Sequence, residues 1–180
     1  MGQDTKLPFA DLPYRKCVGV MLLNQDNRVF VGRRADVQPD AWQMPQGGLG
    51  KKEDPIKGAF RELAEETGIR NAHLLAEVEE WLTYDLPPHL LGKAFRGKYR
   101  GQKQKWIVLR FTGQDQEVDL YRHKKAEFNA WRWVPMQALP QLIVPFKRPI
   151  YEQLVALFAS RFPAIPENGG LSAIPAHGKQ

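Results

Sequence analysis

Residues Gly47–Ile69 read GGLGKKEDPIKGAFRELAEETGI, and this stretch contains the clearest helix signal of the chain. Asp54 can cap the free amides of a first turn, and Pro55 suits the first helical position, where its missing N–H costs nothing. Gly68 follows Thr67 as the expected C-terminal cap. The apolar stripe at helical spacing comprises Ile56, Phe60 and Leu63. The sequence therefore predicts an amphipathic helix from Pro55 to Thr67.

Three acids lie on one face of this predicted helix. Glu62, Glu65 and Glu66 are spaced i, i+3, i+4, so like charges repel at a cost of about 0.2–0.5 kcal/mol per pair. Arg61 is expected to face away from Glu62 but to pair with Glu65, four residues on. Two explanations stay open, a solvated acidic face and a site for a divalent cation such as Mg²⁺ or Mn²⁺, which prefer hard oxygen ligands.

The flanking residues favour the second explanation. From Gly47, five residues lead to Glu53 and seven more to the run Arg61–Ile69, RELAEETGI. This spacing resembles the Nudix box, with each fixed position present. The resemblance implies the Nudix fold, an α/β/α sandwich with a mixed β-sheet and a catalytic helix. It also implies hydrolysis of a nucleoside diphosphate linked to another group.

The same resemblance assigns roles to residues. It implies that Glu62, Glu65 and Glu66 bind metal, with a backbone carbonyl at Gln46–Gly47 as a further ligand. Arg61 becomes the orienting partner, and Glu53 a support for the ligands. Glu127 is implied to lie opposite the helix as another ligand or the general base, although it also reads as a surface acid beside lysines. The sequence leaves open which carboxylate is the base.

Further segments narrow the resemblance. Residues 42–48 (WQMPQGG), 101–106 (GQKQKW), 127–134 (EFNAWRWV) and 145–148 (PFKR) resemble those of bacterial RNA pyrophosphohydrolases and dinucleoside polyphosphate hydrolases. This implies removal of pyrophosphate from the 5′ triphosphate end of RNA, leaving a monophosphate and promoting decay. The alternatives are hydrolysis of diadenosine tetraphosphate and its like, cleansing of free nucleoside triphosphates, and a non-catalytic module that binds RNA or protein.

The resemblance also indicates residues that would bind substrate. Phe146 with Lys147 offers a stacking face and a cation for a base and its phosphate, although Phe146 could equally be a core residue. The basic stretch Lys93–Lys105 reads either as an electrostatic guide for RNA or as a solvated loop. The substrate-binding candidates are Arg15, Arg34, Tyr84, Gln102, Lys105, Phe146 and Lys147, with Arg148 as a further phosphate contact.

Composition sets the wider limits. The chain has 180 residues and 20.6 kDa, 43% of them hydrophobic and 26% charged, which is typical of one globular domain. A net charge of +6 favours anionic partners. The single cysteine, Cys17, excludes an internal disulfide, and no apolar run is long enough to span a bilayer. Without a signal-peptide core, a cytoplasmic protein is expected. The oligomeric state stays undetermined.

The chain organisation follows from apolar runs and breakers. We expect a flexible arm over residues 1–13, one Nudix domain over 14–162 and a disordered tail over 163–180. Residues 16–23 and 28–34 predict a hairpin, and further strands are expected at 74–80, 81–86, 106–111 and 130–134. A short helical stretch is expected at residues 136–142, followed by a last helix over 148–162. Its expected buried face comprises Ile150, Leu154, Leu157 and Phe158, and core packing is expected for at least one of Trp106, Trp131 and Trp133.

Overall fold

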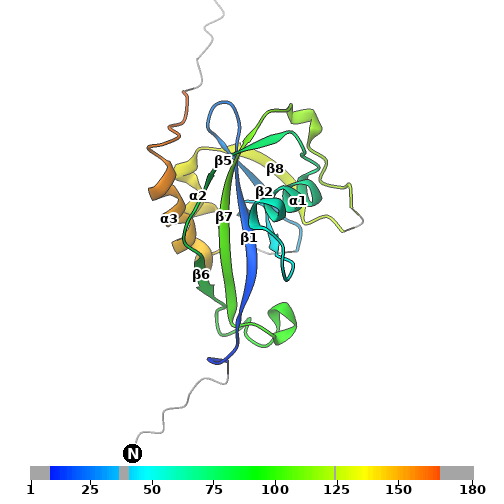
Figure 1. Ribbon diagram of the computed structural model, residues 1–180, viewed down its shortest axis with the longest axis vertical. Helices are drawn as coiled ribbons and strands as arrows, with labels where there is room; N and C mark the ends of the chain where they lie inside the picture. Colours follow the sequence, from blue (N-terminus) through cyan, green and yellow to red (C-terminus); the bar gives the residue numbers. More distant parts are fainter. Residues whose placement is uncertain (1–8, 37–40, 124, 167–180) are drawn as a thin grey trace, which may run out of the picture.

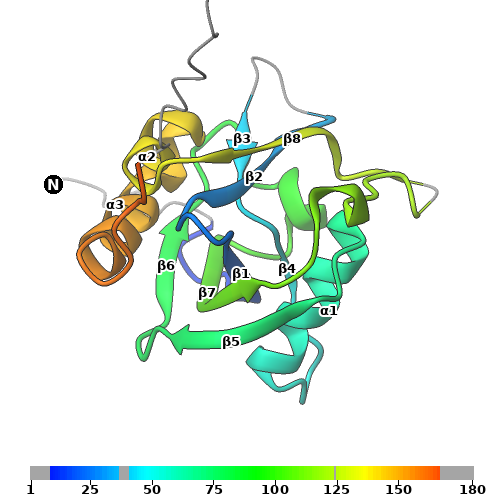
Figure 2. The same ribbon diagram turned by 90° about the horizontal axis from the view of Figure 1, so that it is seen from above.

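The computed structural model describes residues 9–36, 41–123 and 125–166, and these form one mixed sheet with helices on both faces (Figures 1 and 2). The strands are β1 Tyr14–Leu23, β2 Val29–Arg34, β3 Trp42–Gln43, β4 Gln46–Gly48, β5 Ala72–Glu77, β6 Leu82–Asp85, β7 Gly101–Phe111 and β8 Phe128–Val134. The helices are α1 Pro55–Thr67, α2 Leu139–Leu142 and α3 Arg148–Phe158. Four 3-10 turns are η1 Ala94–Gly97, η2 Asp115–Glu117, η3 Met136–Ala138 and η4 Pro145–Lys147.

The long strands β1 and β7 form the centre of the sheet. They pair in parallel from Tyr14 with Gly101 to Leu23 with Arg110, whereas the other pairings are antiparallel. The order along the sheet is β3-β2-β1-β7-β5, with β4 on β1, β6 on β7 and β8 on β2. Because β4 leads directly into α1, the sheet centre and the acidic helix are tied together.

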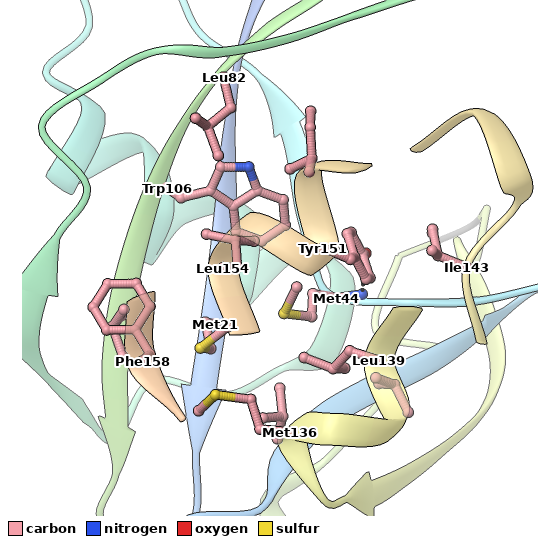
Figure 3. Close-up of a cluster of buried hydrophobic side chains, with 14 of the residues drawn as sticks. Met21, Met44, Leu82, Trp106, Met136, Leu139, Ile143, Tyr151, Leu154 and Phe158 are labelled. Atoms are coloured by element: carbon pink, nitrogen blue, oxygen red, sulfur yellow. Dashed lines mark hydrogen bonds between the residues drawn. The ribbon is translucent and has the colours of Figure 1, made fainter. Parts of the chain in front are cut away.

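Alternation along β1 supplies both layers of the core. Val18, Val20 and Leu22 point to the face that α1 covers, whereas Met21 and Leu23 point to the opposite face. On that second face, Trp106 and the α3 residues Tyr151 and Leu154 pack with Met44 (Figure 3). The expected α/β/α sandwich with a mixed sheet is confirmed.

Helix α1 confirms its predicted ends. The side chain of Asp54 accepts a hydrogen bond from the Lys57 amide at 3.0 Å, and Pro55 is the first helical residue. Gly68 ends the helix with φ of +75°, a left-handed conformation that glycine adopts without steric cost, and its amide donates to the Ala64 carbonyl. Local chemistry alone therefore positions the three acids of this helix.

Several boundaries and one buried face differ from expectation. β1 begins at Tyr14 rather than at residue 16, β5 spans Ala72–Glu77 rather than 74–80, and β8 begins at Phe128 rather than at residue 130. β7 begins at Gly101 rather than Trp106, because its polar first half pairs with β6 and β1. The regular part of α3 ends at Phe158, and one more turn follows to Phe162. Leu157 is 51% exposed, so its predicted burial is wrong, and Tyr151 fills the buried face instead.

The expected arm and tail lie largely outside the described residues. Of the expected tail, the Pro163 carbonyl accepts a hydrogen bond from Asn27 at 2.8 Å. Cys17 is buried and unpaired, as the single cysteine requires, and burial raises the pKa of its thiol to about 11. Trp106 is fully buried, which confirms core packing for one of the three tryptophans. Within the described ranges, no helix is long and apolar enough to cross a membrane.

Candidate active site

An acidic cleft of about 350 Å³ lies beside α1. Glu62, Glu65 and Glu66 reach it from the helix, and Glu127 reaches it from the residue just before β8. Four carboxylates that sequence analysis singled out, one of them more than 60 positions away, thus line one space. The other lining residues are Leu120, His123, Lys125 and Ala126.

Arg61 joins the acids of this region to the backbone of β4. Its guanidinium donates to both carboxylate oxygens of Glu53, at 2.7 and 2.9 Å, and to the Gly48 carbonyl at 3.0 Å. It also donates to Glu62 at 2.7 Å and to Glu65 at 3.2 Å. The prediction that Arg61 faces away from Glu62 is wrong, because the long side chain carries its five donors beyond the diverging Cβ positions.

Glu53 does not line the cleft but contacts Arg61, which in turn contacts the cleft residue Glu62. It is held by Arg61 and by the Gly50 amide, whose hydrogen bond measures 2.8 Å. The Arg61 hydrogen bonds, followed by the Gly50 amide, lower the pKa of Glu53 to about 2. Glu53 therefore stays ionised and fixes the guanidinium that in turn holds Glu62.

Glu66 has the most perturbed carboxyl of the cleft. Loss of solvent around it raises its pKa well above the ordinary value, and the nearby charges of Glu127 and Glu62 raise it further. The Gln46 amide donates to Glu66 at 3.1 Å and acts in the opposite direction. Burial likewise raises the pKa of Glu62. The cleft thus gathers more carboxylates than the neighbouring cationic groups neutralise.

Gly47 brings the β4 backbone against one of these carboxylates. A Cβ at this position would lie 2.0 Å from the carboxyl carbon of Glu62. That distance is far inside van der Waals contact, so only glycine allows the backbone and Glu62 to occupy their places. The fixed glycine of the motif therefore has a steric reason.

We expect Gly47→Ala to lower turnover by about 10²-fold while changing the melting temperature little. The added methyl group displaces the Glu62 carboxylate, which is the mobile end of a side chain, so the chemistry is disturbed more than the packing. Steady-state kinetics and thermal unfolding check this. A matched loss of several degrees in melting temperature would contradict it.

The carboxylate set fits a divalent cation. Four oxygen-bearing side chains line one cleft, and the mutual repulsion felt by Glu66 is what a cation relieves. In the described part of the chain, no three acidic, histidine or cysteine side chains are already gathered closely enough to enclose an ion. Arg61 holds Glu62 and Glu65 instead, and Arg34 holds Glu127 at 2.6 Å. A bound cation would therefore share these carboxylates with Arg61 and Arg34.

A second cavity, of about 650 Å³, adjoins the cleft and shares Glu127 with it. Gln46 and Gly47 form part of its wall. Six of the seven substrate-binding candidates line this cavity although the sequence separates them widely. They are Arg15, Arg34, Tyr84, Gln102, Phe146 and Lys147.

Two cations mark the boundary between cavity and cleft. Arg34 donates to both carboxylate oxygens of Asp36, at 2.8 and 2.7 Å, in addition to its Glu127 ion pair. Burial, followed by the charge of Arg34, lowers the pKa of Lys147 to about 8. An anionic group placed here would offset the repulsion between these two cations.

Phe146 has both of the roles that the sequence left open. It packs against the α3-side core and also lines the cavity, where its ring centroid lies 5.5 Å from that of Tyr84. The Lys147 ammonium sits 5.5 Å above the Tyr84 ring. The cavity therefore has an aromatic wall with a cation beside it.

The structure does not bring Lys105 to this cavity. Its ammonium lies 3.0 Å from Glu77 and donates to the Glu79 carbonyl at 2.7 Å. Gln102 and Lys105 are an odd number of positions apart on β7, so their side chains point to opposite faces. Arg148 also lies apart from the cavity lining and donates to the Pro140 carbonyl.

We expect Lys105→Met to leave the KM for substrate within about twofold and to lower stability by about 1–2 kcal/mol, because a largely buried ion pair and hydrogen bond are lost. Thermal unfolding and steady-state kinetics on the same preparation separate the two effects. A large rise in KM at unchanged stability would instead return Lys105 to the substrate site.

Sequence reasoning missed several lining residues. Asp36 lines the cavity and His123 lines the cleft without any motif that marks them, and Gln43 lines the cavity from within the segment 42–48, where no role was assigned to it. The side-chain nitrogen of Gln43 is buried and has no hydrogen-bond partner among the described residues. Phe95 reaches the cavity from the segment between β6 and β7. The expected basic guide over Lys93–Lys105 is divided, since Arg100 pairs with Asp85 as Lys105 does with Glu77.

Comparisons with known proteins agree on one family. A model of the NUDIX domain matches residues 13–154. The chain is 52% identical over 161 residues to the RNA pyrophosphohydrolase of Bradyrhizobium sp. (strain ORS 278), covering 84% of this chain and 96% of that protein. It is 55% identical over 159 residues to the RNA pyrophosphohydrolase of Rhodospirillum rubrum, covering 88% and 95%.

Solved structures share the fold at lower identity. The E. coli dihydroneopterin triphosphate pyrophosphohydrolase matches with a TM-score of 0.62 at 24% identity, covering 81% of this chain and 99% of that one. A C. elegans Ap4A hydrolase binary complex matches with a TM-score of 0.56 at 15% identity, covering 80% and 98%. At these identities the likeness concerns the fold alone.

Proposed function

This chain belongs to the Nudix family, and we propose that it hydrolyses the 5′ triphosphate end of RNA, releasing pyrophosphate and leaving a 5′ monophosphate. One observation carries the proposal: the acidic cleft and the aromatic, cationic cavity meet at the Arg34–Glu127 ion pair. A substrate with a polyphosphate joined to a nucleoside needs both spaces side by side. The RNA pyrophosphohydrolases at 52% and 55% identity support the choice of RNA.

A divalent cation, for which we propose Mg²⁺, completes the cleft. The residues that would hold it are Glu62, Glu65, Glu66 and Glu127, which line the cleft, and the backbone carbonyl of Gln46, which lies in the adjoining cavity wall. Such a cation, when bound, lowers the pKa of a water molecule and neutralises charge on phosphate oxygens. Glu53 and Arg61 would keep Glu62 in position without binding the cation.

The remaining side chains would bind and orient the substrate. Arg34 and Lys147 would neutralise the polyphosphate, and Arg15 and Gln102 would contact it from β1 and β7. Phe146 and Tyr84 would stack a base, and the unpartnered Gln43 nitrogen is positioned to donate to one of its acceptors. A carboxylate of the cleft would accept the proton of the attacking water and hold it in line.

Dinucleoside polyphosphates present the same chemical groups, a base beside a chain of phosphates, and form the second candidate class. The decisive experiment offers triphosphorylated RNA, diadenosine tetraphosphate and free nucleoside triphosphates side by side with Mg²⁺ and identifies each product. We expect RNA to give the highest kcat/KM and pyrophosphate as product. A higher kcat/KM for either of the other substrates would overturn the assignment to RNA.

A further inference from the structure

The segment between β6 and β7, residues 86–100, forms one end of the cavity. Its base is closed by a hydrogen bond from the Leu86 amide to the Arg100 carbonyl at 2.7 Å and by two Arg100–Asp85 contacts of 3.0 Å. Leu90 and Ala94 pack against the α3-side core and line the cavity. The segment is therefore anchored to the sheet at both ends and along its inner side.

Two residues of this segment have a strained backbone. Phe95 has φ, ψ of 53°, 33° and Arg96 has 58°, 30°, which is the left-handed region. This conformation costs an L-residue about 1–2 kcal/mol. Gly92 and Gly97 hold the other left-handed positions of the segment, where glycine avoids that cost. A strained residue between two glycines indicates that its side chain is kept for a reason other than folding.

The ring of Phe95 faces the cavity. It packs against the edge of the α3-side core, lines the cavity wall, and lies 5.3 Å from the guanidinium carbon of Arg15, which lines the same cavity. Tyr99 supports it at a centroid distance of 6.4 Å. The cavity thus has a second aromatic face with a cation beside it, separate from the Phe146–Tyr84 wall.

The two aromatic faces belong to different elements of one cavity wall. Lys147, next to Phe146, is electrostatically coupled to Glu127 and Glu66. Phe95 belongs instead to the segment at the lower ends of β1 and β7 in Figure 1, below the chain that leads into β8. A nucleic acid whose 5′ phosphates occupy the cleft and whose base lies at Phe146 would therefore have Phe95 available further along the same cavity wall.

We propose that Phe95 stacks against the RNA base that follows the one held at Phe146, so that the cavity binds two successive nucleosides. The inference rests on the proposed function and deepens it, since a free nucleotide would leave Phe95 unused. Stacking on an aromatic ring tolerates any base, so Phe95 sets the length of RNA that is bound rather than its sequence.

The test measures binding of oligonucleotides that carry a non-hydrolysable 5′ triphosphate and lengthen one nucleotide at a time, in the presence of Mg²⁺. We expect the affinity of the unmodified protein to rise about tenfold at one particular added nucleotide. An abasic nucleotide at that position removes the rise. Phe95→Gly also removes it, while its melting temperature changes little, because relief of the strain offsets the lost packing of the ring.

Matched variants separate the ring from the backbone. Arg96→Gly relieves the same kind of strain one residue away and keeps the ring, so the tenfold rise with length should persist. Phe95→Tyr keeps an aromatic face and should also preserve the rise. The inference is overturned if Phe95→Gly retains the rise, if Arg96→Gly loses it, or if the unmodified protein shows none.

Failure of the proposed function gives a different result. A protein that binds longer RNA more tightly through Phe95 but hydrolyses diadenosine tetraphosphate better than RNA keeps the stacking assignment and loses the proposed reaction. A protein that hydrolyses RNA but binds short and long RNA equally well keeps the proposed reaction and loses the stacking assignment of Phe95.

Discussion

Glu66→Gln is expected to lower hydrolysis of triphosphorylated RNA by at least about 10³-fold and to stabilise the cation-free protein at the same time. Glutamine keeps the shape of the side chain and can still accept the hydrogen bond from the Gln46 amide. It loses the charge that would hold a cation or accept a proton. Steady-state kinetics with Mg²⁺ measure the first effect, and thermal unfolding in a chelator measures the second.

The gain in stability follows from the direction of the Glu66 pKa. Burial and the charges of Glu127 and Glu62 raise the folded-state pKa, whereas the unfolded carboxyl titrates near about 4.3. The stabilising contribution of the protonated group is therefore complete at pH below about 4.3 and is lost as pH rises through the folded-state pKa. Glutamine is uncharged at every pH and does not lose this contribution as the pH rises. We expect Glu66→Gln to gain about 1–2 kcal/mol, or roughly 3–6 °C in melting temperature.

The pH profile supplies the control for this interpretation. The melting temperature of the cation-free unmodified protein should fall between about pH 4.5 and neutrality more steeply than that of Glu66→Gln. Glu152→Gln, an exposed substitution on α3, should change neither activity nor this slope. Parallel profiles for the unmodified protein and Glu66→Gln would contradict the electrostatic argument.

The same variant decides between an enzyme and a binding module. An enzyme loses turnover with Glu66→Gln, whereas a non-catalytic module would show no hydrolysis before the substitution and equal RNA affinity after it. Four repelling carboxylates in one cleft have no use in a module that binds an anionic RNA. The arrangement therefore favours catalysis over binding alone.

Local signals made the helix predictable. Asp54, Pro55 and Gly68 each act within a turn of their own position, so the ends of α1 could be predicted from neighbours in sequence. The continuous apolar run at residues 17–23 is likewise typical of a strand buried on both faces, which β1 is. The motif spacing then indicated which helix face would carry the acids.

Contacts between distant segments were not predictable in the same way. The closeness of Gly47 and Glu62 depends on how β4 packs against α1. The residue types alone do not predict that these two residues will be in contact. The role of Phe95 depends on a left-handed backbone at a residue that rarely adopts one. Lys105 could have been excluded by strand parity, but only with β7 extended back to Gly101, because Gln102 then fixes which face each residue occupies.

Arg61→Ala is expected to act on stability in the opposite direction to Glu66→Gln while also abolishing most activity. The guanidinium holds Glu53, Glu62 and Glu65 and ties them to the Gly48 carbonyl. Its removal leaves three carboxylates without their shared cation. Because the site is partly exposed, we expect a loss of about 2–3 kcal/mol, or roughly 5–10 °C in melting temperature, and a fall in turnover of at least about 10²-fold.

Arg61→Lys separates charge from geometry. Lysine restores a positive charge but cannot donate in parallel to both oxygens of Glu53 while also reaching Glu62. We therefore expect it to recover part of the stability and little of the turnover. A variant with full activity would show that Arg61 contributes only charge.

Mg²⁺ provides the most direct check on why Arg61→Ala is unstable. If repulsion among the released carboxylates is the cause, added cation should raise the melting temperature of Arg61→Ala by more than that of the unmodified protein. The same cation should stabilise Glu66→Gln by less, because that variant has one fewer charge to neutralise. Equal shifts of the melting temperature in all three proteins would mean that the carboxylates of α1 do not bind the cation. The assignment of this cleft as a cation site would then be wrong.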